Sequence, residues 1–159
     1  MNLKNIKLVT FTLIALSLSI SASSGTVLAA SGCQKVKGIE NGVLNPDGTG
    51  ASGTIIQGGK LNGTSQVLLS SLFTATADPF TYSFTDNLTL TTNEGVLRTN
   101  NVTLFDTANG LSTAIARINA NASEGIFAGA TGVLYLNGEA TNAEGAFVAE
   151  ITGEICFAN

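Results

Sequence analysis

The stretch FTYSFTDNLTLT, from Phe80 to Thr91, alternates between two kinds of side chain along its whole length. One face carries the apolar residues together with a single acid: Phe80, Tyr82, Phe84, Asp86, Leu88 and Leu90. The other face carries only Thr, Ser and Asn. A period of two is typical of a half-buried β-strand. The Asn93–Gly95 turn and a second run over Val96–Phe105 then predict a hairpin.

Working outward, the rest of the chain after residue 30 consists of similar short runs separated by Gly, Asn and Asp. No window has a sustained 3.6-residue apolar stripe of the kind that predicts a helix. Eight strands are expected, at residues 34–40, 52–57, 64–76, 80–91, 96–105, 113–120, 133–137 and 146–157, with a turn region at 41–50. This series predicts an all-β fold, a small antiparallel up-and-down barrel, with a β-sandwich as the alternative.

The first thirty residues differ in kind from the rest. Met1–Lys7 is basic, Leu8–Ile20 is an apolar run, and the segment ends in the small residues Ala29 and Ala30. This order predicts a secretory signal peptide over 1–30, followed by a single domain over 31–159 that is secreted or periplasmic. The apolar run is shorter than the roughly 20 residues of a membrane-spanning helix, and no membrane span is expected.

Two cysteines lie near the two ends of this domain, Cys33 and Cys156. An exported domain meets oxidising conditions, so the pair predicts a disulfide. Closing a loop of roughly 120 residues is worth about 4–5 kcal/mol in the chain-entropy model. The alternative is a lipid anchor at Cys33, because Ala29-Ala30-Ser31-Gly32-Cys33 loosely resembles a bacterial lipobox.

The composition excludes several function classes. The chain has no His and no Trp, which removes triads with a His base and zinc sites built on His. Two cysteines are too few for an all-cysteine zinc site, so no metal and no cofactor are predicted. Without Lys4 and Lys7 the domain has five basic and eleven acidic residues, a net charge of −6. Such a domain has no electrostatic footprint for nucleic acid.

Four residues are candidates for a ligand site. Asp86 lies among apolar neighbours on the predicted inner face, where a carboxylate has a raised pKa or a positive partner. Arg117 is a conceivable partner, and Tyr82 and Tyr135 could hydrogen-bond a ligand. The alternatives are a bulge that turns Asp86 to solvent and ordinary packing of the two tyrosines.

The second half of the chain carries a family resemblance. The residues concerned are Gly125–Leu134 (GIFAGATGVL), Gly138 and Ile151–Ile155 (ITGEI). They resemble a late strand and the closing strand in bacterial relatives of the allene oxide cyclase and dirigent barrel superfamily. The resemblance implies an eight-stranded, calycin-like barrel whose mouth binds small apolar or aromatic molecules. It identifies no catalytic residue in this chain.

These observations favour an exported, non-catalytic β-barrel that binds a small apolar molecule or takes part in an extracellular assembly. One alternative is a cyclase-like or dirigent-like protein that guides a reaction. Another is a structural surface protein without a ligand. The sequence leaves the oligomeric state open.

Overall fold

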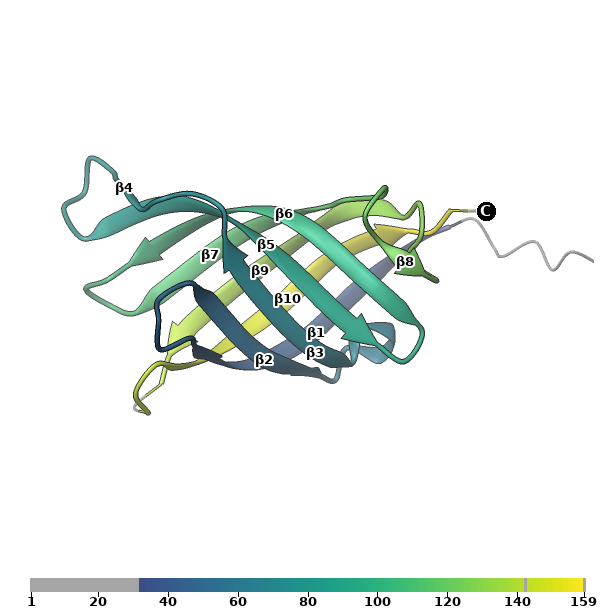
Figure 1. Cartoon of the computed structure of the whole chain (residues 1–159), viewed down its shortest axis with the longest axis horizontal. Coiled ribbons are helices and arrows are strands. Elements are labelled where there is room, and N and C mark those ends of the chain that lie inside the picture. The colour runs from purple at the N-terminus through teal and green to yellow at the C-terminus, as the bar shows by residue number, and fades with distance from the viewer. Residues whose placement is uncertain (1–31, 142, 159) are drawn as a thin grey trace, which may run out of the picture.

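The computed structural model describes residues 32–141 and 143–158, and these residues form a β-barrel (Figure 1). The strands are β1 (Cys33–Leu44), β2 (Gly50–Ile56), β3 (Gly63–Leu69), β4 (Thr74–Ala75), β5 (Thr81–Thr92), β6 (Gly95–Asp106), β7 (Leu111–Ile118), β8 (Glu124–Gly125), β9 (Thr131–Ala140) and β10 (Ala146–Cys156). One 3-10 turn, η1 (Gly59–Leu61), joins β2 to β3. No helix in this described part of the chain is long and apolar enough to cross a membrane.

Eight of the strands close on one another in an antiparallel ring. Their order around the barrel is β1-β2-β3-β5-β6-β7-β9-β10, and β10 pairs with β1 to complete it. The short strands β4 and β8 add to β5 and β6 at the two ends. The predicted all-β, up-and-down barrel is therefore confirmed, and the sandwich alternative is not what forms. Closure pairs each of these eight strands with a neighbour on both sides, which protects their edges from pairing with other chains.

The two ends of the barrel differ. One end holds η1, β8 and the chain segment from 119 to 130, and we call it the plugged end. Its core consists of fully buried apolar side chains, including Leu61, Leu90, Leu97, Phe127 and Ile155. The other end holds β4, the connections 45–49, 70–80 and 107–110, and residues 141 and 143–145, and we call it the open end (Figure 1). Several of its inward-facing side chains, including Tyr82, Phe84 and Phe105, are only half-buried.

The first strand is longer than predicted. The turn expected over 41–50 is wrong for Asn41–Leu44, which continue β1, and the chain reverses only at 45–49. Gly42 faces inward, and the Phe147 ring occupies the place where a Gly42 side chain would lie. The Asn-Gly pair therefore marks close packing inside the barrel instead of a turn.

The third strand is shorter than predicted. It ends at Leu69, and residues 70–80 leave the barrel as a projecting arm that contains β4. The backbone N–H groups of Ser70 and Ser71 both donate to the carbonyl of Thr85, at 2.9 and 3.2 Å. Two residues thus face one on β5, which is the arrangement of a β-bulge and turns the chain outward.

The predicted disulfide is present and closes the seam between the first and last strands. Cys33 lies opposite Cys156 in the β1–β10 register, and their sulfurs are bonded. A thiol in this bond cannot also carry a lipid, so the structure favours the disulfide over the lipid anchor. The predicted signal peptide, residues 1–30, lies outside the described residues and stays a prediction.

Candidate functional site at the open end of the barrel

Asp86 faces the interior, as the alternation of its strand predicts. It is 3% exposed, and the alternative in which a bulge turns it to solvent is wrong. One carboxylate oxygen accepts from the amide of Asn101, its direct partner on β6, at 2.6 Å, and the other accepts from the Thr103 hydroxyl at 2.6 Å. Thr99 in turn donates to the Asn101 side-chain carbonyl at 2.6 Å. Three successive inward positions of β6 are therefore polar.

The predicted partnership between Asp86 and Arg117 is wrong. Arg117 shares the exposed outer face of β7 with Ile115, while Ala114 and Ala116 face the interior. Among the described residues the one ion pair joins Arg98 to Glu124 on the surface, at 3.6 Å. Asp86 is thus stabilised by neutral hydrogen-bond donors and has no cation as a partner.

A second buried carboxyl, Glu40 on β1, was not among the candidates from the sequence. It is 1% exposed and accepts a hydrogen bond from the Ser65 hydroxyl on β3. The strand between them contributes Gly53, where a Cβ would come within 3.0 Å of the Ser65 oxygen. Gly53 therefore leaves the space through which Glu40 and Ser65 meet.

Both carboxyls have perturbed acidities. Burial raises the pKa of Asp86, although the hydrogen bonds from Thr103 and Asn101 oppose the shift. Burial also raises the pKa of Glu40; the Ser65 hydrogen bond opposes that shift, and the charge of Asp86 adds to it. The charge of Asp86 thus reaches Glu40 across the barrel interior.

This pair predicts an unusual pH dependence. Above the ordinary values, 3.8 for Asp86 and 4.5 for Glu40, the folded protein retains protons that the unfolded chain has lost. Stability from this source is therefore complete below those values and is lost as the pH rises through the raised pKa values. We expect the free energy of unfolding to fall over this window, and Glu40→Gln or Asp86→Asn to flatten the fall.

Urea unfolding at a series of pH values measures this slope. Asp47 and Asp106 have lowered pKa values, from hydrogen bonds to Thr49 and to Asn109, and they contribute the opposite slope only at lower pH. Comparing each variant with the wild type at equal pH isolates the contribution of Glu40 and Asp86 to this slope. A slope identical in the wild type and both variants would rule out this account.

Aromatic side chains line the inside of the open end beyond Asp86. Tyr82, Phe84 and Phe105 face inward and are half-buried. Phe73 from the arm packs on Phe84 with ring centroids 4.6 Å apart. Tyr82 is thus two inward positions from Asp86, as predicted, whereas Tyr135 lies on the outer wall and is 47% exposed. The structure does not bring Tyr135 together with Asp86.

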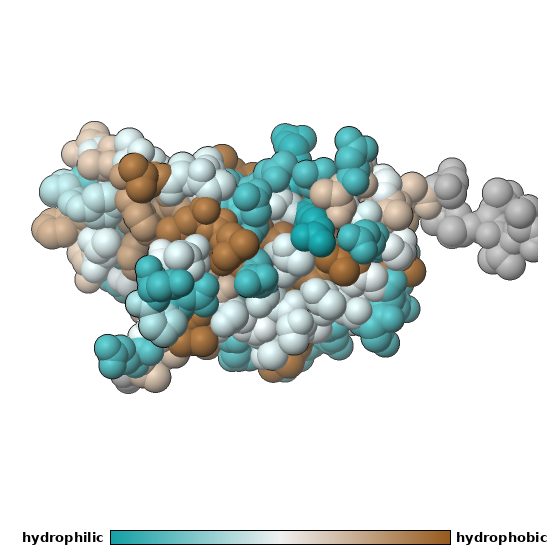
Figure 2. Space-filling model, viewed as in Figure 1, coloured by the Kyte–Doolittle hydropathy of each residue, from teal (hydrophilic) through white to brown (hydrophobic). Residues whose placement is uncertain are grey.

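Large exposed apolar side chains gather at this same end (Figure 2). Leu72 and Phe73 in the arm are 87% and 51% exposed, and Phe80 at the foot of the arm is 56% exposed. Four others lie at the strand ends around the mouth: Val43, Leu44, Leu104 and Leu111. We call these seven residues the apolar rim. At the plugged end the comparable exposed residues are Ile56 and Ile126.

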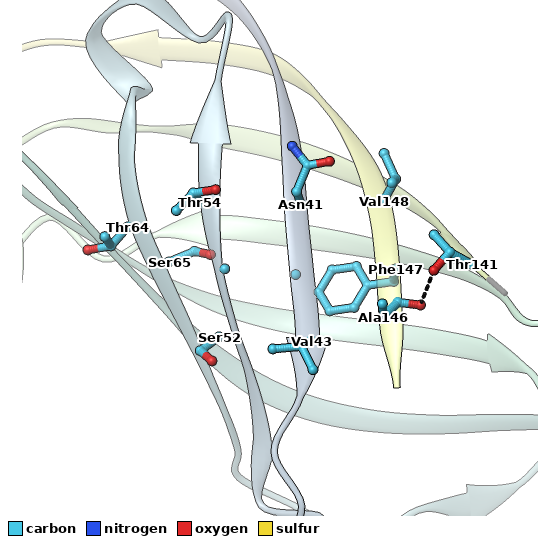
Figure 3. Close-up of a pocket in the computed structure, with 12 residues that line it drawn as sticks. Asn41, Val43, Ser52, Thr54, Thr64, Ser65, Thr141, Ala146, Phe147 and Val148 are labelled. Atoms are coloured by element: carbon cyan, nitrogen blue, oxygen red, sulfur yellow. Dashed lines mark hydrogen bonds between the residues drawn. The ribbon is translucent and has the colours of Figure 1, made fainter. Parts of the chain in front are cut away.

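Two open hollows lie along the barrel wall. The larger, about 620 Å³, lies over β1, β2 and the start of β10, near the open end. Its lining is uncharged and includes Val43, Thr54, Val148 and the Phe147 ring (Figure 3). The smaller, about 400 Å³, lies beside the disulfide and is lined by Lys35, Val133, Tyr135, Glu154 and neighbouring residues. Neither is a closed chamber inside the barrel.

The buried side-chain oxygen and nitrogen atoms of the described residues all have hydrogen-bond partners within the protein. Cys33, Glu154 and Cys156 come within 4.8 Å of one another, but both sulfurs are used in the disulfide and cannot bind a metal as thiolates.

Comparison with known proteins finds no protein family, no curated protein and no solved structure that matches the chain.

Proposed function

We propose that this protein is an exported, non-catalytic binding barrel whose open end takes up an apolar group, as part of an extracellular assembly. The observation that supports this most strongly is the concentration of the apolar rim at one end. Large contiguous apolar surface is uncommon on monomers and marks interaction sites. Export is supported by the predicted signal peptide and the disulfide.

A second candidate function is the binding of a small apolar molecule within the mouth. The half-buried ring of Tyr82, Phe84 and Phe105 favours it, because ligand sites combine apolar walls with a few polar groups such as Asp86 and Thr103. The cyclase-like or dirigent-like alternative would use this same mouth to shape a substrate. It rests on the family resemblance alone, since Asp86 lacks a charged partner.

Nile red, a neutral apolar dye, tests the open end directly. We expect its fluorescence to rise on titration with the protein, and Leu72→Ser, Phe73→Ser and Phe80→Ser together to remove most of that rise. The matched control is Ile56→Ser with Ile126→Ser, which removes exposed apolar residues from the plugged end. A rise of equal size in both variants, or none in the wild type, would contradict the proposal.

Native mass spectrometry of the protein purified from its producing cells separates the two candidates. A mass excess of a few hundred daltons that is lost on denaturation indicates a small molecule in the mouth. Masses at multiples of the chain, or of the chain with a second protein, indicate an assembly.

A further inference from the structure

Charge is distributed unevenly along the barrel. At the open end, four acids lie in or at the ends of four different connections: Asp47, Asp78, Asp106 and Glu144. Glu139, near the end of β9, adds a fifth. Hydrogen bonds from Thr49 and Asn109 lower the pKa values of Asp47 and Asp106, which favours their charged forms. The apolar rim is thus surrounded by negative charge.

All five basic residues in the described part of the chain lie toward the other end, which also carries the acids Glu94, Glu124 and Glu154: Lys35, Lys37, Lys60, Arg98 and Arg117. Arg98 is paired with Glu124, and the Lys60 ammonium lies 4.6 Å from the centre of the Phe157 ring. Lys35, Lys37 and Arg117 are exposed on the outer wall. We call these three the basic patch.

The basic patch borders a surface that contains exposed apolar side chains and one acid. In the register, Lys35 on β1 lies opposite Glu154, which lies opposite Val133, which lies opposite Arg117. The next outward row carries Lys37, Thr152, Tyr135 and Ile115. Ile115 and Tyr135 are 53% and 47% exposed. The 400 Å³ hollow lies among these residues and is lined by Lys35, Val133 and Tyr135 together with one acid, Glu154.

We propose that copies of this protein associate head to tail, with the arm of one copy (residues 70–80) seated in the hollow of the basic patch on the next. The proposal rests on the proposed role of the open end as a binding surface. Leu72 and Phe73 would cover Val133, Tyr135 and Ile115, and Asp78 would approach Lys35 and Arg117. Complementary charge favours this encounter, whereas two acidic open ends repel each other.

The two surfaces of this contact are different, so each joined pair leaves one arm and one basic patch free. Such heterologous contacts continue into open chains unless the rotation between copies closes a ring. Sedimentation velocity of the disulfide-bonded domain at about 10 mM salt should show mass increasing with protein concentration. In about 1 M salt, where the Debye length is about 3 Å, the increase should be much weaker.

A pair of charge-reversed variants tests the geometry. Variant A carries Asp78→Lys, Glu139→Lys and Glu144→Lys at the open end, and variant B carries Lys35→Glu, Lys37→Glu and Arg117→Glu in the basic patch. Each alone presents two surfaces of one sign, and we expect its self-association to weaken on the order of tenfold or more. Mixed in equal amounts, A and B should associate again, because each now complements the other.

A wild type that stays monomeric at every concentration overturns the proposal, and so does an equimolar mixture that stays monomeric although A and B are folded by circular dichroism. If a charge variant fails to fold, Leu72→Ser with Phe73→Ser replaces it, since both residues are exposed in the arm. That variant should lose association, and association at wild-type strength overturns the proposal. The Nile red titration needs no second copy, so it shows separately whether the open end binds apolar groups.

Discussion

Replacing both Cys33 and Cys156 by serine is expected to lower the free energy of unfolding by about 4–5 kcal/mol. The bond joins residues separated by 123 positions, so it restricts nearly the whole domain in its unfolded state. A second contribution adds to this, because the same bond fixes the end of the β1–β10 seam on which barrel closure depends. For a domain of this size the loss corresponds to a Tm lower by roughly 10–20 °C.

Thermal unfolding with and without a reducing agent provides the measurement. The double serine variant should melt at the temperature of the reduced wild type and should not respond to the reductant. If the reductant leaves the Tm of the wild type unchanged, the disulfide does not contribute in this way. A second check is the mass of the denatured wild-type chain, which should increase by two hydrogens on reduction.

The barrel could be predicted because inward and outward residues alternate strictly along β5 and β10. In β5 the inward face, Tyr82 to Leu90, is mainly apolar, and the structure has it as predicted. The inward face of β10, Phe147 to Ile155, is likewise apolar or small. The alternation of β10 puts Cys156 on the outer face, and it lies opposite Cys33 in the register. Strand identity and the position of the disulfide thus follow from a period of two.

The interior polar groups could not be found in the same manner. On β6 the inward positions are Leu97, Thr99, Asn101, Thr103 and Phe105, while Val102 and Leu104 point outward. Each face of this strand mixes polar and apolar residues, so the pattern does not indicate which face is buried. Only the β5–β6 register, which places Asn101 opposite Asp86, identifies the network.

The burial of Glu40 and the exposure of Arg117 could not be predicted from the sequence either. Glu40 stands next to Asn41-Gly42, a dipeptide typical of turns, and a residue beside a turn is expected to be exposed. It is buried because Gly42 and Gly53 leave space that Phe147 and Ser65 fill from other strands. Arg117 was paired with Asp86 on chemical grounds, but its strand turns it to the opposite side of the wall. Long-range packing decides both positions.

Phe127→Ala is expected to cost about 3–5 kcal/mol of stability, the usual range for removing a fully buried Phe. The ring is 0% exposed and lies 6.1 Å, centroid to centroid, from Phe157. Its backbone belongs to a tight turn in which Ala130 donates to the Phe127 carbonyl at 3.0 Å. Because that turn holds the ring in place, the surroundings cannot readily collapse into the space that alanine leaves.

Urea unfolding of Phe127→Ala measures this cost, and Phe80→Ala is the matched control because that ring is 56% exposed at the open end. We expect the control to change stability by less than about 1 kcal/mol. Equal costs for the two variants would mean that the plugged end is not the stabilising core.

Phe127→Ala is also informative in the Cys33→Ser, Cys156→Ser background. It separates the stability that comes from the plugged-end core from the stability that comes from the disulfide. Phe157 follows Cys156 directly, so the disulfide could also act by holding Phe157 against Phe127. If the disulfide acts mainly on the unfolded chain, the cost of Phe127→Ala should be the same in both backgrounds within about 0.5 kcal/mol. A cost smaller by more than that in the serine background would show that the bond stabilises the barrel partly by closing its plugged end.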